Sequence, residues 1–162
     1  MSGESRPVAL ITGGSRGIGR ATALRLAEDG FDIAFCYVSD SGAAQDLEKK
    51  LLDLGAEVYL RRTDVSDAAS VATLVDGAED ALGPITVVVN SAGVVRDNPL
   101  ALMEDADWHG VLRPNLDGVY HVCRAVVEGM MRRRRGVIVN LSSIAGLHGN
   151  AGQANYASAK AG

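Results

Sequence analysis

The sequence predicts an α/β fold built on a doubly wound parallel sheet, and three observations support this prediction. Short runs rich in β-branched residues alternate with longer stretches whose apolar residues recur at helical spacing. The short runs are apolar at nearly every position, as expected of strands that are covered on both faces of a parallel sheet. A glycine-rich turn stands between the first run and the first helical stretch, where α/β sheets bind nucleotides.

Five strands are expected, each followed by at least one helix. The strands are expected at residues 8–11, 33–37, 57–60, 85–89 and 137–141. The helices are expected at residues 17–30, about 43–54, 67–82, 100–112, 116–134 and from about 155 onward.

Glycines are expected to end the first three helices, because this residue readily adopts the left-handed conformation that terminates a helix. They are Gly30, Gly55 and Gly83. Ser66 is expected to cap the start of the third helix. The run at residues 85–89 is almost continuously β-branched, which indicates a central strand.

Composition limits the class of protein. The 162 residues, 47% of them hydrophobic and 22% charged, predict a single globular domain. A net charge of −4 and an aromatic content of 4% make nucleic acid an unexpected partner. No uncharged apolar run approaches the roughly 20 residues of a membrane span, and polar residues 1–6 do not resemble a signal peptide. A cytoplasmic protein without a membrane partner is expected.

The glycine-rich turn at residues 12–19 reads Thr-Gly-Gly-Ser-Arg-Gly-Ile-Gly. At a helix start, unpaired N–H groups and the positive end of the helix dipole attract an anion, and glycines let a pyrophosphate approach the backbone. Its place after the first buried strand therefore predicts a dinucleotide site. The residues expected to contact this ligand are Gly13, Ser15, Arg16, Gly17, Ile18 and Gly19.

The spacing of these glycines resembles that of the short-chain dehydrogenase/reductase family, and four further motifs resemble the family in the same order. They are Asp64-Val65, Asn90-Ser91-Ala92-Gly93, Asn115-Leu116, and Ser143 followed by Tyr156-xxx-Lys160. Two positions depart from the family pattern, because Ser91 replaces an asparagine and Pro114 precedes the helix asparagine. The resemblance covers residues 8–162 and implies a Rossmann fold.

The resemblance also implies which residues bind the cofactor and which carry the chemistry. The further cofactor contacts it implies are Ser39, Asp64, Val65, Asn90, Ala92, Gly93, Tyr156 and Lys160. The catalytic residues it implies are Ser143, Tyr156, Lys160 and Asn115. A tyrosine at its usual pKa of about 10 is too weak an acid to protonate a carbonyl at neutral pH. A lysine ammonium one helical turn away favours the ionised form of the phenol.

Charge around the adenosine ribose predicts the form of the cofactor. An acidic residue about 20 positions beyond the glycines accepts from a free 2′-hydroxyl, whereas an arginine accommodates a 2′-phosphate. Arg16 lies inside the turn, and residues 37–39 at the end of the second strand include no carboxylate. NADP(H) is therefore expected. Asp40 is the counter-argument, unless its side chain serves the loop or the start of the next helix.

Within the family, residues 96–98 and 149–162 most resemble the 3-oxoacyl-acyl-carrier-protein reductases. This implies NADPH-dependent reduction of a 3-oxoacyl thioester in fatty acid biosynthesis, with acyl carrier protein as a partner and a homotetramer at full length. One alternative is another short-chain dehydrogenase, acting on acetoacetyl-CoA, a polyketide, a small alcohol or a sugar. The other is an inactive truncated nucleotide-binding module, because the chain stops two residues after Lys160 and the C-terminal part of the domain is expected to be absent.

Residues outside these motifs receive simpler interpretations. Cys36 and Cys123 stand singly in apolar segments without metal-ligand spacing, so both are expected to be core thiols and no metal site is expected. His109 and His121 fall in expected helices without a recognisable partner. His148 is expected in a solvated loop between the catalytic residues.

Four consecutive arginines, Arg132 to Arg135, end the expected helix at residues 116–134. Cations complement the negative end of a helix dipole, so one interpretation is a solvated last turn. The other is a docking patch for an acidic carrier protein. The sequence leaves both open.

Overall fold

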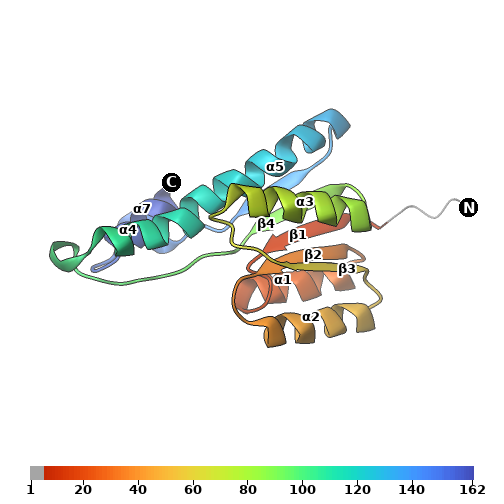
Figure 1. The fold of residues 1–162 in the computed structure, drawn as a ribbon, viewed down its shortest axis with the longest axis horizontal. Helices are drawn as coiled ribbons and strands as arrows, with labels where there is room; N and C mark the ends of the chain where they lie inside the picture. Colours follow the sequence, from red (N-terminus) through yellow and green to blue (C-terminus); the bar gives the residue numbers. More distant parts are fainter. Residues whose placement is uncertain (1–5) are drawn as a thin grey trace, which may run out of the picture.

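The computed structural model describes residues 6–162 and contains a five-stranded parallel sheet with helices on both faces (Figure 1). The prediction about a signal peptide concerns residues that lie largely outside this described range. The strands are β1 (Val8–Thr12), β2 (Asp32–Tyr37), β3 (Val58–Arg62), β4 (Ile85–Asn90) and β5 (Val137–Asn140), in the order β3-β2-β1-β4-β5. The predicted doubly wound α/β fold is confirmed.

The helices follow the strands along the chain as predicted. They are α1 (Gly17–Glu28), α2 (Ser41–Asp53), α3 (Ala68–Leu82), α4 (Asp105–Leu112), α5 (Gly118–Arg133), α6 (Ile144–His148) and α7 (Ala154–Ala161), with a 3-10 turn η1 (Leu100–Leu102) and a π-helical turn η2 (Arg113–Asp117). Figure 1 shows α1 and α2 on one face of the sheet and α3 and α5 on the other. Gly30, Gly55 and Gly83 have positive φ angles at the helix ends where they were expected.

The core has two halves because successive side chains of a strand point to opposite faces of the sheet. Val8 and Leu10 of β1 pack with buried side chains of α3 and α5. Ala9 and Ile11 pack with those of α1 and α2. β1 is therefore buried on both faces, and it is hydrogen-bonded on both edges, to β2 and to β4. β4, predicted to be central, is likewise paired on both edges, with β1 and β5.

Three local predictions were wrong. Asp67, not Ser66, caps α3, since its carboxylate accepts a hydrogen bond from Ala69 N at 3.1 Å. The helix expected at 100–112 is interrupted, because the backbone of Met103 is extended between η1 and α4. His148 does not lie in a loop but ends the short helix α6, which the sequence pattern did not reveal.

Pro114 does not separate two helices, because the π-helical turn η2 joins α4 directly to α5. Proline lacks the N–H that an α-helix requires at this point, and single π-helical turns inside helices are frequent at functional sites. Asn115, in the middle of this turn, is buried. None of the helices within residues 6–162 has the length and apolar character needed to cross a bilayer.

Candidate functional site

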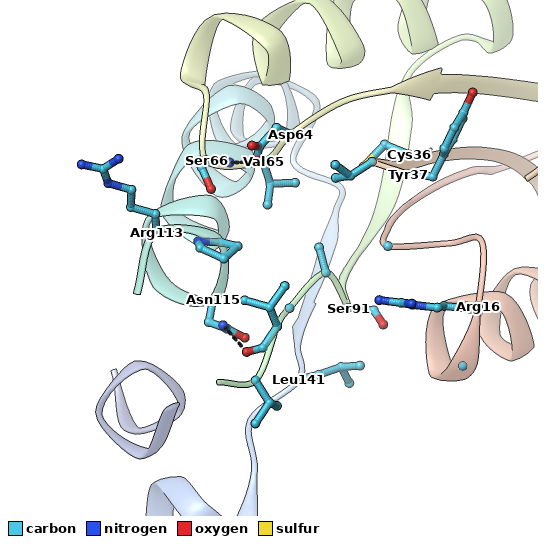
Figure 2. Close-up of a pocket in the computed structure, with 18 of the residues that line it drawn as sticks. Arg16, Cys36, Tyr37, Asp64, Val65, Ser66, Ser91, Arg113, Asn115 and Leu141 are labelled. Atoms are coloured by element: carbon cyan, nitrogen blue, oxygen red, sulfur yellow. Dashed lines mark hydrogen bonds between the residues drawn. The ribbon is translucent and has the colours of Figure 1, made fainter. Parts of the chain in front are cut away.

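A pocket of about 700 Å³ lies at the carboxyl ends of the strands (Figure 2). Parallel strands bring their carboxyl ends to one edge of the sheet, so motifs far apart in the sequence meet there. Most of the predicted site residues line this pocket. They are Gly13, Ser15, Arg16, Gly17, Ile18, Ser39, Asp64, Val65, Ala92, Gly93, Asn115, Tyr156 and Lys160.

Three predicted site residues, Gly19, Asn90 and Ser143, are not among the residues that line the pocket. A Cβ on Gly19 would lie 2.5 Å from Gly13 O, so this glycine lets α1 pack against the turn. Asn90 is buried and donates a hydrogen bond to Asn140 Oδ1 at 2.9 Å, tying β4 to β5. Ser143 caps α6, where its Oγ accepts from Ala145 N at 3.2 Å.

The glycine-rich turn has the geometry of an anion site. Gly13 has a φ of +65°, and a Cβ there would lie 2.8 Å from the Cα of Ala92. Arg16 is extended at the N-cap of α1 and makes no side-chain cap. The first N–H groups of α1 therefore have no side-chain partner at the cap and are available to a bound phosphate.

The side chain of Thr12 and the backbone of Cys36 hold this turn to its neighbours. Thr12 Oγ1 accepts hydrogen bonds from the N–H groups of Ser91 and Ala92, both at 3.1 Å. Gly14 N donates to Cys36 O at 3.0 Å. Cys36 is buried, which confirms the prediction of a core thiol, and this burial raises the pKa of the thiol to about 11. Cys123 is only partly buried, and its Sγ accepts from Asn90 Nδ2 at 3.6 Å.

A positive group from the start of α1 and a negative group that follows β2 lie at the rim of the pocket. Figure 2 shows Arg16 extending from the start of α1 toward the pocket. Asp40 also lines the pocket, but it caps α2, where Oδ1 accepts from Ala43 N at 2.9 Å. This supports the interpretation of Asp40 as the start of a helix.

The turn after β3 forms another part of the rim, and it has a partner that sequence reasoning missed. Asp64 Oδ1 accepts from Ser66 N at 2.9 Å, and the side chain of Val65 is buried. His121 Nδ1 lies 3.0 Å from Val65 O. The prediction that His121 has no partner is therefore wrong; the two residues are 56 positions apart, and no local pattern links them.

Tyr156 and Lys160 lie one turn apart on α7 and face the pocket. Lys160 Nζ is 5.9 Å from the centre of the Tyr156 ring and donates to Leu141 O at 2.7 Å. Burial lowers the pKa of the Lys160 ammonium. Asn155, fully buried, fixes the start of this helix by donating to Arg96 O and Asp107 O at 3.1 and 3.2 Å.

Asn115 brings a polar group from η2 to the same place. Its Nδ2 donates to Val94 O and Val111 O, both at 2.8 Å, whereas its buried Oδ1 has no partner among residues 6–162. A Cβ on Gly93 would lie 2.5 Å from Asn115 Oδ1 and 3.8 Å from Lys160 Nζ. An acceptor and an ammonium therefore share one niche above Gly93. Residues 6–162 contain no cluster of three or more His, Cys, Asp or Glu suited to a metal ion.

Comparisons with known proteins agree with this geometry. Residues 7–162 match the family described as short chain dehydrogenase. A 3-oxoacyl-[acyl-carrier-protein] reductase of Staphylococcus aureus is 40% identical over 154 residues, which are 95% of this chain and 63% of that protein. The corresponding reductase of Synechocystis sp. is 41% identical over 162 residues, which are 100% of this chain and 66% of that protein. The chain thus spans slightly less than two thirds of the length of these relatives.

Solved structures show the same arrangement of elements. Levodione reductase matches with a TM-score of 0.92 and 35% identity, over 98% of this chain and 62% of that chain. NAD⁺-bound xylitol dehydrogenase matches with a TM-score of 0.92 and 34% identity, over 97% of this chain and 60% of that chain.

Proposed function

Because this chain belongs to the short-chain dehydrogenase family, we propose that the protein is an NADPH-dependent reductase of 3-oxoacyl thioesters, with the acyl group carried on acyl carrier protein. The observation that carries the proposal is the group formed by Tyr156, Lys160 and Asn115 at one end of a pocket whose other end is a glycine-rich turn. The relatives that are 40% and 41% identical are 3-oxoacyl-[acyl-carrier-protein] reductases.

The pocket fits a nicotinamide dinucleotide at both ends. The start of α1 offers N–H groups to the pyrophosphate, and Gly13 leaves room for it beside Ala92. At the adenine end, Asp64 offers a carboxylate oxygen to an amino group, and the neighbouring Val65 N–H has no partner within residues 6–162. When bound, the reduced nicotinamide supplies the hydride for the substrate carbonyl.

The chain's own residues supply the proton and orient the carbonyl. We assign the general acid to the Tyr156 hydroxyl, which donates its proton to the carbonyl oxygen. The Lys160 ammonium, oriented by Leu141 O at 2.7 Å, stabilises the phenolate that remains. Ser143 uses an oxygen lone pair to cap α6, so its hydroxyl proton is free to be donated to the same carbonyl oxygen.

Two observations support NADPH rather than NADH. Arg16 makes no side-chain cap on α1 and lies at the rim of the pocket, where its guanidinium suits a 2′-phosphate. The carboxylate of Asp40 accepts a hydrogen bond from the α2 backbone, so it already has a structural role at the helix start.

Two of the four consecutive arginines at residues 132–135 support a docking patch for the proposed carrier protein. Arg132 pairs with Glu128, and Arg133 pairs with Glu79 at 3.2 Å and donates to Ile85 O at 3.1 Å. Neither Arg134 nor Arg135 makes a side-chain hydrogen bond or ion pair within the described part of the chain. These two guanidinium groups are the ones available to an acidic partner.

Assembly into a homotetramer also stays part of the proposal. Tyr120, Val127 and Met131 are exposed on α5, and their spacing of seven and four residues places them on one helix face. An exposed apolar face on a long helix is suited to contact with a second copy of the chain.

The decisive experiment compares wild-type full-length protein with Tyr156→Phe in the NADPH-dependent reduction of acetoacetyl-CoA. The substitution keeps the ring and removes the proton, so kcat should fall by about 10²- to 10⁴-fold while the Kd for NADPH stays unchanged. Tyr59→Phe, in β3 and outside the residues that line the pocket, is the matched control and should retain full activity.

Retained turnover in Tyr156→Phe would show that another group donates the proton. If the wild-type protein bound NADPH but reduced only a small ketone or a sugar, the assignment as a reductase would hold and the assignment of a thioester substrate would be wrong. Binding without any turnover would favour a nucleotide-binding module.

A further inference from the structure

The turn from Asp64 to Asp67 joins β3 to α3 at the rim of the pocket, and its polar groups are mostly paired within the turn. Asp64 Oδ1 accepts from Ser66 N at 2.9 Å, and Asp64 O accepts from Asp67 N at 3.1 Å. Neither bond involves Val65. Figure 2 shows Asp64, Val65 and Ser66 together at this rim.

The carbonyl of Val65 is held from outside the turn, by α5. His121 Nδ1 lies 3.0 Å from Val65 O. A carbonyl oxygen can only accept a hydrogen bond, so Nδ1 carries the proton and donates it. Because the imidazole is partly buried, water competes less for this bond than it would at an exposed site.

Gly118, three residues before His121 on the same face of α5, brings the helix close to the turn. A Cβ on Gly118 would lie 2.6 Å from Val65 Cγ2 and 3.4 Å from Val65 O. The backbone of α5 at Gly118 and the imidazole of His121 therefore hold Val65 from two sides. The N–H of Val65 has no partner within residues 6–162, and Val65 lines this end of the pocket.

We propose that His121 is a positioning residue for cofactor binding: by holding the Val65 carbonyl, it orients the turn that receives the adenine half of the dinucleotide. This inference rests on the proposed function, since it presupposes a dinucleotide in the pocket. His121 is not among the residues that line the pocket, and its hydrogen bond goes to Val65 at the adenine end, so we expect its effect to be confined to that end.

Two variants of the full-length protein separate the hydrogen bond from the packing. His121→Phe keeps a ring of similar size and removes the donor. His121→Asn loses the ring but places an amide N–H at the position of Nδ1. His109→Phe, at an exposed histidine of α4, is the matched control. His121→Ala replaces His121→Phe if the phenyl ring prevents folding.

Three ligands test different parts of the pocket. NADPH occupies the whole pocket, adenosine 2′,5′-bisphosphate only the adenine end, and reduced nicotinamide mononucleotide only the other end. We expect His121→Phe to weaken NADPH and the bisphosphate equally, by roughly 3- to 10-fold, the effect of one net hydrogen bond. The activity supported by the mononucleotide, and kcat at saturating NADPH, should not change. His121→Asn should bind NADPH within about twofold of wild type.

Equal losses at both ends of the pocket, or a lower kcat at saturating NADPH, would overturn the inference by showing a general structural role. So would a failure of His121→Asn to restore binding when its melting temperature equals that of the wild type. If the wild-type protein bound none of the three ligands, the proposed function itself would be wrong, and this inference with it. If NADPH bound normally to every variant, only the inference would be wrong.

Discussion

At the cofactor end of the pocket every residue of β1 is buried, whereas at the catalytic end β5 exposes Val137 by 56% and Val139 by 41%. The following helices differ less, because α1 packs Ala23 and Ala27 into the core but exposes Ile18, whereas α6 exposes Ile144 and Leu147. The cofactor end is therefore fixed by a closed apolar core. The geometry of the catalytic end depends much more on single polar contacts.

Those contacts are few and can be named. Lys160 Nζ donates to Leu141 O, and Ser142 Oγ donates to Lys160 O, both at 2.7 Å. A Cβ on Gly146 would lie 2.7 Å from the carbonyl carbon of Lys160, so α6 and α7 touch through their backbones. We expect the two ends to respond differently to perturbation, and four experiments test this, from the largest expected effect to the smallest.

The largest effect is expected from a polypeptide of residues 1–162 alone. Within residues 6–162 β5 is an edge strand that exposes Val137 and Val139, and the eight-residue helix α7 is shorter than the about 12–15 residues that an isolated helix needs for marginal stability. Acetoacetyl-CoA reduction should be undetectable while NADPH binding, measured by fluorescence titration, remains weak but measurable. A sharp cooperative melt together with activity would show that the catalytic end is as self-sufficient as the cofactor end.

Gly93→Ala should come next, because it acts where the catalytic contacts converge. The new Cβ would lie 2.5 Å from Asn115 Oδ1, so the asparagine or the lysine beside it must move. A displacement of about 1 Å at a reacting site lowers kcat by about 100-fold. Gly42→Ala is the control, since a Cβ there meets only Asp40 Oδ1 at 3.6 Å. Unchanged kcat in Gly93→Ala would mean that the niche is not part of the active site.

Arg16→Ala tests the cofactor end without disturbing its core. If the guanidinium binds a 2′-phosphate, the Kd for NADPH should rise about 10- to 100-fold, the effect of a charge-assisted hydrogen bond, and the Kd for NADH should hardly change. Arg25→Ala provides the comparison, because Arg25 lies in the last turn of the same helix and pairs with Glu28 and Asp29. Equal losses for the two cofactors would contradict the NADPH assignment.

The smallest effect is expected at the end of α5, far from both ends of the pocket. The double variant Arg134→Asn, Arg135→Gln should raise KM for a carrier-bound substrate roughly 3- to 10-fold and leave KM for acetoacetyl-CoA unchanged. Asparagine suits the left-handed backbone of Arg134, whose φ is 51°. The difference should shrink as salt rises. An identical effect on both substrates would favour the interpretation that these arginines only form a solvated last turn of the helix.

The strands and the pocket could be predicted from the sequence because their signals are local. Each strand lies within two residues of its expected bounds, since a run buried on both faces is apolar throughout. Parallel pairing then gathers the motifs that follow the strands at one edge of the sheet. The placement of Tyr156 and Lys160 beside Asn115 follows from this topology together with the family resemblance.

The remaining features depend on contacts that no local pattern encodes. Ser66 and Asp67 are both good helix caps, and the path of the backbone after β3 decides between them. The five residues of α6 are too few for a periodic pattern. The bond between His121 and Val65 joins segments that meet only after α5 has packed against α3.

The π-helical turn η2 joins α4 and α5 into one continuous helix, and its length determines which side chains of α5 face Val65 and α3. Each residue of an α-helix advances the chain by about 100° around the axis. Removing one residue between positions 113 and 117 would therefore swing Gly118 and His121 away from Val65 and bring exposed side chains of α5 toward α3. Insertions and deletions at surface loops are generally absorbed, whereas this five-residue turn inside a continuous helix cannot absorb a change in length.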